Sequence, residues 1–151
     1  AVVIWKDWVA YRGPAEDDPP LDLLYAGGFL HDCIEDTESD YEDVADVAGA
    51  DVADWVRLLS MDKRRPADER RREYEAKLID APFPARVIKL ADLLSNLRGI
   101  RGSEGMAWIG SYLDLVEFQL SLLGPGLSHL ERYREAEALV QRWREMLHLE
   151  D

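Results

Sequence analysis

The stretch ARVIKLADLLSNLRGI, residues 85–100, carries the clearest helical pattern in this chain of 151 residues. Its apolar side chains recur at positions 87, 88, 90, 91, 94 and 97, so one face of the predicted helix is apolar. Asp92 lies among leucines, where an unpaired carboxylate would be costly to bury. Its partner is either a cation of the same helix, Lys89 or Arg98, or a bound metal ion.

The same periodicity predicts helices on both sides of this stretch. Proline and glycine separate them, at APFP before it and at RGSEG and GPG after it. Ser39, with Glu42 three residues later, has the form of a capping box, and Gly49 should end that helix. Sustained alternation of apolar and polar residues is missing. We therefore expect an all-α fold, a bundle of six to eight helices with no significant sheet, over about 2–12, 21–36, 40–48, 50–60, 68–80, 85–100, 106–123 and 127–148.

The composition narrows the class of protein. A net charge of −13 argues against DNA or RNA as a partner, because their phosphates need a basic surface. No apolar run reaches the length of about 18 residues that a membrane span needs. The single Cys33 cannot form an internal disulfide and suits the cytoplasm, which is the expected location. The oligomeric state stays open. The five tryptophans are expected to be core or helix-packing residues.

The stretch GGFLHDCIEDT, residues 27–37, places a His–Asp pair one helical turn before a Glu–Asp pair. Four-residue spacing stacks His31 over Glu35 and Asp32 over Asp36 if one helix runs through all four residues. Imidazole nitrogen together with carboxylate oxygen suits Mn²⁺, Fe²⁺ or Zn²⁺ more than Ca²⁺. The sequence therefore predicts a metal-ligand pair followed by two carboxylates that can orient or deprotonate a water. A capped, solvated acidic helix end is the alternative.

The two stretches together resemble the hydrolase domain of RelA/SpoT-type proteins, a branch of the HD phosphohydrolases. GGFLHDCIEDT is similar to that family's A-x-L-L-H-D-x-x-E-D-T segment, and KLADLLSNLR, residues 89–98, to its K-L-A-D-x-x-x-N-x-R segment. The resemblance extends over about 21–148 and is strongest to the small single-domain alarmone hydrolases. It implies an HD-domain helical bundle.

The resemblance also implies roles for single residues. His31, Asp32 and Asp92 would be metal ligands, and Glu35 and Asp36 would activate the attacking water. The ion would be Mn²⁺ or another divalent transition metal. The residues implied or considered for contact with the substrate are Asn96, Tyr112, Lys63 and Arg98. Lys63 could meet substrate phosphates, although its place in a charged connector also suits a solvated side chain.

One family feature is missing from residues 1–151, a further ligand histidine in an H-P pair that opens an early helix. In one register Trp5 occupies that place and the metal site is broken. In the other, which we favour, the histidine and the family's first helix lie upstream of Ala1. Residues 13–20 are then an inserted acidic, proline-rich loop, and residues 1–151 form a single HD-type hydrolase domain.

The expected activity is the metal-dependent hydrolysis of guanosine 3′,5′-bis(diphosphate), or of the pentaphosphate, at the 3′-diphosphate. Two alternatives remain. One is an HD phosphohydrolase that acts on another nucleotide. The other is a degenerate HD domain that binds a nucleotide or a protein without turnover, which the missing histidine favours.

Overall fold

A computed structural model describes residues 1–148, and within that range the chain is helical and contains no strand. This confirms the all-α prediction. Nine helices are present among the described residues, and one of them, α3, is a single turn of four residues. Their bounds are α1 Val2–Arg12, α2 Leu21–Leu30, α3 Cys33–Asp36, α4 Tyr41–Ala48, α5 Ala50–Leu59, α6 Ala67–Ile79, α7 Phe83–Gly99, α8 Met106–Leu127 and α9 Glu131–His148. None of the helices described is both long enough and apolar enough to cross a membrane.

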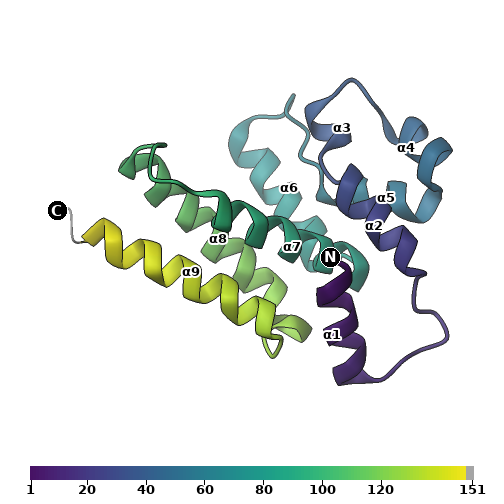
Figure 1. Ribbon diagram of the computed structural model, residues 1–151. Helices are drawn as coiled ribbons and strands as arrows, with labels where there is room; N and C mark the ends of the chain where they lie inside the picture. Colours follow the sequence, from purple (N-terminus) through teal and green to yellow (C-terminus); the bar gives the residue numbers. More distant parts are fainter. Residues whose placement is uncertain (149–151) are drawn as a thin grey trace. The chain divides into compact units, whose positions relative to one another are not determined.

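The chain divides into two compact units, which meet within α7. The first runs from Ala1 to Lys89, and the second starts at Leu90. In the first unit α5 packs against α2, α3, α4 and α6, and α1 packs against α2 (Figure 1). The core side chains there include Leu24, Val52, Val56, Leu78 and Ile88, each at most 1% exposed. Helix α5 is therefore the central support of the first unit.

Gly27 allows α2 to approach the rest of this core. A Cβ atom at that position would lie 2.6 Å from Ile88 Cδ1 and 3.3 Å from Trp55 Cε3. Such distances are well inside van der Waals contact, so only glycine fits without repacking. The neighbouring Gly28 has no comparable neighbour, since a Cβ there would meet only Ala1 Cβ, at 3.9 Å.

The second unit contains the antiparallel pair α8 and α9 (Figure 1). The predicted break at GPG is present as a kink, with non-helical backbone at Pro125 and Gly126. Proline supplies no N–H for the helical ladder at this point. The buried Tyr133 hydroxyl donates to the Leu120 carbonyl, at 2.8 Å, and ties α9 to α8 just before the kink. Helix α9 begins at Glu131, four residues later than the pattern predicted.

The start of α4 differs from the predicted capping box by one residue. Asp40 is the N-cap, its carboxylate accepts from the Asp43 amide, and the Asp43 carboxylate accepts from the Asp40 amide. Ser39 is instead part of the preceding turn, where its amide donates to the Thr37 hydroxyl. Asp40 and Asp43 therefore form the capping box in place of the predicted Ser39 and Glu42.

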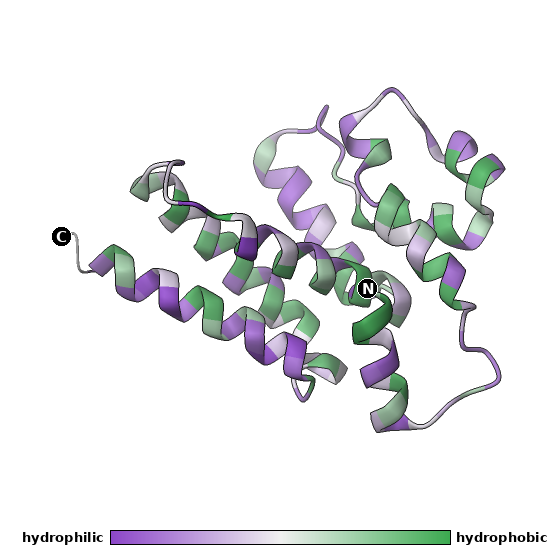
Figure 2. Cartoon of the chain, viewed as in Figure 1, coloured by the Kyte–Doolittle hydropathy of each residue, from purple (hydrophilic) through white to green (hydrophobic). Residues whose placement is uncertain are grey.

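Figure 2 shows hydrophilic and hydrophobic residues alternating along the helices.

Candidate active site

The predicted single helix over 21–36 is interrupted at His31 and Asp32. Helix α2 ends at Leu30, the two residues form a turn, and α3 starts at Cys33. Asp32 has φ −101° and ψ −4°, in the sparsely populated bridge between regular regions. Its carbonyl accepts from the Glu35 and Asp36 amides, at 3.1 and 2.8 Å. The His31–Asp32 pair therefore lies in a turn and the Glu35–Asp36 pair on α3, and the stacking expected from one continuous helix does not apply.

The His31 ring is oriented by the last turn of α2. Its Nδ1 lies 2.9 Å from the Gly28 carbonyl oxygen, and because a carbonyl can only accept, Nδ1 carries the proton of this bond. The other nitrogen, Nε2, lies 2.9 Å from Asp32 Oδ2. If the ring is neutral, two lone pairs face each other there, which is an arrangement that a cation stabilises.

The spacing of these two atoms suits neighbouring ligands of one metal ion. Two bonds of about 2.1 Å at a right angle hold their donor atoms about 3.0 Å apart. The His31 side chain is 23% exposed and that of Asp32 57%, so an ion could reach both from solvent. The donor set and its spacing therefore fit a divalent transition metal.

Helix α3 carries the two predicted catalytic carboxylates and is closed by Thr37. The Thr37 hydroxyl donates to the Cys33 carbonyl, at 2.6 Å, and accepts from the Ser39 amide, at 3.0 Å. This side chain ends the helix and turns the chain towards α4. The threonine of the E-D-T sequence therefore has a local structural role. Cys33, on the same turn, is half-buried, and this burial raises the pKa of its thiol, which disfavours the reactive thiolate.

The connector after α5 holds both carboxylates. The Met61 amide donates to Glu35 Oε2, at 3.0 Å. Lys63 Nζ lies 2.5 Å from Asp36 Oδ1 and 3.8 Å from Glu35 Oε1. The hydrogen bond to Asp36 raises the pKa of Lys63. Lys63, which was predicted as a possible phosphate contact, thus lies between the two acids. The part played by the Met61 amide was not predicted, because a backbone donor can belong to any type of residue.

The remaining predicted site residues, Asp92, Asn96, Arg98 and Tyr112, lie in the second unit. Asp92 is half-buried on α7, and its Oδ1 accepts from Asn96 Nδ2, at 2.8 Å, one helical turn on. Four-residue spacing brings the two side chains onto one face. Asn96, predicted to contact the nucleotide, therefore also orients the carboxylate predicted to bind metal.

Asn96 and Tyr112 line a common pocket of about 390 Å³, to which α7 and α8 both contribute. The Trp108 ring, also in its lining, stacks on Tyr112 with centroids 5.2 Å apart and planes 5° apart. Trp108 is 51% exposed, so this one of the five tryptophans predicted as core or helix-packing residues lies outside the core. A flat aromatic pair next to an amide, with Trp108 exposed and Tyr112 half-buried, is suited to stack on a planar base.

Arg98 is paired with Glu135, whereas the sequence suggested Asp92 or the substrate as its partner. Its Nε donates to Glu135 Oε1 of α9, at 2.9 Å. Hydrogen bonds from Arg132 and from Arg98 lower the pKa of Glu135. Both the ion pair with Asp92 and the substrate contact were possible from the sequence, and the structure gives Arg98 a bridging contact between α7 and α9.

No family model matches the chain, but single relatives do. The chain is 38% identical over 79 residues to guanosine-3′,5′-bis(diphosphate) 3′-pyrophosphohydrolase MESH1 of Drosophila melanogaster, a match that covers 52% of this chain and 44% of the relative. It is 34% identical over 86 residues to the Homo sapiens protein of the same name, covering 57% and 48%. The chain thus spans about half the length of the curated relatives it matches.

Solved structures extend the similarity in fold. A structure described as "A metazoan ortholog of SpoT hydrolyzes ppGpp and plays a role in starvation responses" superposes with a TM-score of 0.66 at 22% identity, covering 93% of this chain and 80% of that one. The crystal structure of lmo0812 from Listeria monocytogenes EGD-e gives 0.62 at 21% identity, covering 94% of both chains. The resemblance to the small alarmone hydrolases is thereby confirmed, in sequence over about half of the chain and in fold over nearly all of it.

Proposed function

We propose that this protein is a metal-dependent hydrolase of nucleotide polyphosphates that removes the 3′-diphosphate of guanosine tetra- or pentaphosphate as pyrophosphate. The observation that carries the proposal is the His31–Asp32 pair, with Nε2 and Oδ2 2.9 Å apart, immediately before a helical turn that presents Glu35 and Asp36. The names of the matched relatives, which are pyrophosphohydrolases of this nucleotide, support the choice of substrate.

We infer that His31, Asp32 and Asp92 hold the ion and that the ion is Mn²⁺. One imidazole and two carboxylates form a donor set that suits a divalent transition metal. When bound, such an ion lowers the pKa of a coordinated water and offsets negative charge at the phosphate. The Gly28 carbonyl and the Asn96 amide each hold one of these ligands in place, as the outer contacts of metal sites commonly do.

In this proposal Glu35, with Asp36 beside it to position the water, takes the proton that the attacking water loses. Hydrolysis joins the water oxygen to phosphorus and breaks the bond between phosphorus and the ribose 3′ oxygen, and that oxygen leaves with the proton taken from the water. Glu35 is the better-positioned base, because Met61 fixes its Oε2 while its side chain stays only 18% exposed. Tyr112, Trp108 and Asn96 would bind the nucleoside, and Lys63 would hold the two acids as well as any nearby phosphate.

The proposed ligand is a free nucleotide in the cytoplasm, and neither DNA nor a membrane is a proposed partner. The net charge of −13 supports this choice, since a long polyanion would be repelled while a small one can be held by a metal and a few local cations.

Substitution of the carboxylates tests the proposal. Glu35→Gln and Asp36→Asn should each lower kcat by about 10²–10⁴-fold, the usual contribution of a general base. Elemental analysis should find the same amount of bound manganese in both variants as in the wild type. Glu38→Gln, an exposed acid two residues further on, is the matched control and should keep full activity. Unchanged turnover in both variants would remove these residues from the mechanism. A wild-type protein that binds but never hydrolyses any nucleotide in a substrate panel would instead favour the binding-domain alternative.

A further inference from the structure

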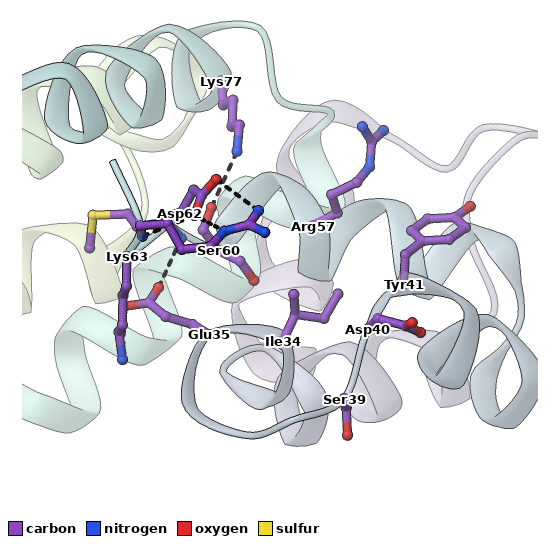
Figure 3. A pocket seen from close by; sticks show the side chains of 12 residues that line it. Ile34, Glu35, Ser39, Asp40, Tyr41, Arg57, Ser60, Asp62, Lys63 and Lys77 are labelled. Carbon is purple, nitrogen blue, oxygen red and sulfur yellow. Dashed lines mark hydrogen bonds and ion pairs between the residues drawn. The ribbon is translucent and has the colours of Figure 1, made fainter. Parts of the chain in front are cut away.

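The first unit contains a second feature, an open pocket of about 490 Å³ beside Glu35 (Figure 3). Four cationic side chains line it, from α5, the connector and α6: Arg57, Lys63, Arg64 and Lys77. The chain has 18 Lys and Arg against 31 Asp and Glu, yet only three acids line this pocket, Glu35, Asp40 and Asp62. The pocket is therefore a local exception to the acidic character of the chain.

Each of the three acids of the pocket has a partner other than Lys77. Asp40 caps α4, and Glu35 accepts from the Met61 amide. Asp62 accepts from Arg64 Nε and Nη2, at 2.8 and 3.0 Å, and these bonds lower the pKa of Asp62 to about 2. Asp62 therefore offsets Arg64, and Glu35 lies 3.8 Å from Lys63, but none of the three acids is paired with Lys77.

Lys77 is the cation with the weakest partner. It is half-buried, and among the residues that the structure describes its ammonium donates one hydrogen bond, of 3.3 Å, to the Ser60 carbonyl. Figure 3 shows this side chain reaching from α6 over Ser60 and Asp62. An ammonium has three donors, so two remain for a ligand. A half-buried cation without a carboxylate partner is suited to an incoming anion.

Two arginines can add to such an anion. The side chain of Arg64 is 91% exposed and that of Arg57 60% exposed. Each holds a surface ion pair, Arg64 with Asp62 and Arg57 with Asp54 at 3.2 Å, and exposed pairs of this kind are weak enough to be shared with an incoming anion. Arg57 lies 5.8 Å above the Tyr41 ring, which borders the same space. Guanidinium groups bind phosphate oxygens in a bidentate manner, and the volume exceeds that of one phosphate.

We propose that this pocket binds a diphosphate group, with Lys77 as its central contact and Arg57 and Arg64 as flanking ones. The group belongs either to free pyrophosphate or to the 5′-diphosphate of a bound nucleotide. The second assignment rests on the proposed function, whereas binding of free pyrophosphate does not.

Isothermal titration calorimetry of the full chain with inorganic pyrophosphate measures the affinity of the pocket. A chelator in the buffer removes any bound metal, so that the pocket is tested alone. Lys77→Met should weaken binding about tenfold or more, the typical effect of losing one charge-assisted hydrogen bond, and Lys77→Arg should restore most of it. Lys6→Met removes the same charge from an exposed position on α1 and should change nothing. Arg64→Gln, at a residue too exposed to affect folding, should also weaken binding.

Wild-type protein that takes up no pyrophosphate, or a Lys77→Met variant that binds as well as Lys6→Met, would overturn the proposal. Steady-state kinetics with guanosine tetraphosphate then identify the source. A rise in KM by the same factor as the loss of pyrophosphate binding assigns the pocket to the nucleotide, and an unchanged KM assigns it to free pyrophosphate. Pyrophosphate binding without any hydrolysis by the metal-loaded wild type would contradict the proposed function and leave the pocket in place.

Discussion

Asn96 illustrates how a single side chain can serve a metal ligand. Its amide donates to Asp92 Oδ1, at 2.8 Å, and it also borders the pocket that contains Tyr112 and Trp108. An amide that is committed to a carboxylate fixes the direction of that carboxylate. Asn96 therefore has a role in the proposed metal site that does not require a nucleotide.

We predict that Asn96→Ala lowers the affinity for Mn²⁺ about 10–100-fold, as is typical when the partner of a metal ligand is removed. Manganese titration followed by electron paramagnetic resonance measures this directly. Ser95→Ala, at the exposed neighbouring position, is the control and should bind manganese normally. A higher KM for nucleotide with unaltered manganese affinity would mean that Asn96 contacts only the substrate.

At the scale of elements, the turn between α3 and α4 depends on short polar side chains at successive positions. Thr37 closes α3 and Asp40 opens α4. Between them the Ser39 amide donates a hydrogen bond to the Thr37 hydroxyl. The α4 helix has only eight residues, so its first turn is a large part of its stability.

Asp40→Ala should therefore destabilise the protein by about 1 kcal/mol, the usual cost of losing an N-cap. Ser39→Ala should cost much less, since the structure gives that hydroxyl no capping role. The midpoint of urea unfolding, measured for both variants at one pH, separates them. A larger loss of stability in Ser39→Ala than in Asp40→Ala would show that Ser39 is the N-cap, as the sequence pattern predicted.

The helices themselves were largely predictable, because periodic apolar residues and the Gly and Pro breaks act locally. The prediction was less accurate where two local signals competed. The helical pattern continues through His31 and Asp32, but the backbone turns there, and nothing in the spacing of apolar residues distinguishes a turn from one more helical residue. Likewise Ser39 and Asp40 are both good N-caps by residue type, and the choice between them depends on the Thr37 turn.

The site was predictable where chemistry requires a residue type and not where it requires a backbone group. His31, Asp32, Glu35 and Asp36 stand out by sequence, whereas the Met61 amide that holds Glu35 could be any residue. Lys77 lies 17 residues from Ser60 in the chain, and only folding brings its ammonium to that carbonyl. The cationic pocket therefore has no compact sequence motif.

On the scale of the whole molecule, the excess of acids over bases opposes folding. With a net charge of −13, mutual repulsion is greater in the folded than in the expanded chain. Salt screens this repulsion over a Debye length of about 10 Å at 0.1 M. Several ion pairs of the described residues join two exposed side chains, and such pairs contribute little on their own.

We therefore predict that the thermal midpoint rises by about 2–4 °C between low salt and about 0.3 M NaCl, which corresponds to about 1 kcal/mol. Scanning calorimetry at neutral pH measures it. Asp17→Asn combined with Asp46→Asn, two exposed acids, lowers the negative charge and should reduce the dependence on salt. A midpoint that falls with salt would show that attractive ion pairs outweigh the repulsion.

Trp108 gives the protein an optical signal of its own. Trp5 and Trp55 are buried, at 4% and 7% exposed, while Trp108 is half in water and stacked on Tyr112 beside Asn96. Indole emission shifts to longer wavelength as water reaches the ring. Trp8 and Trp143 are half-buried, so Trp108, the most exposed of the five tryptophans, should emit furthest to the red. A base that settles on the Trp108 ring would quench that edge and leave the blue emission of the core unchanged, and the occupied pocket could then be followed in solution without any dye.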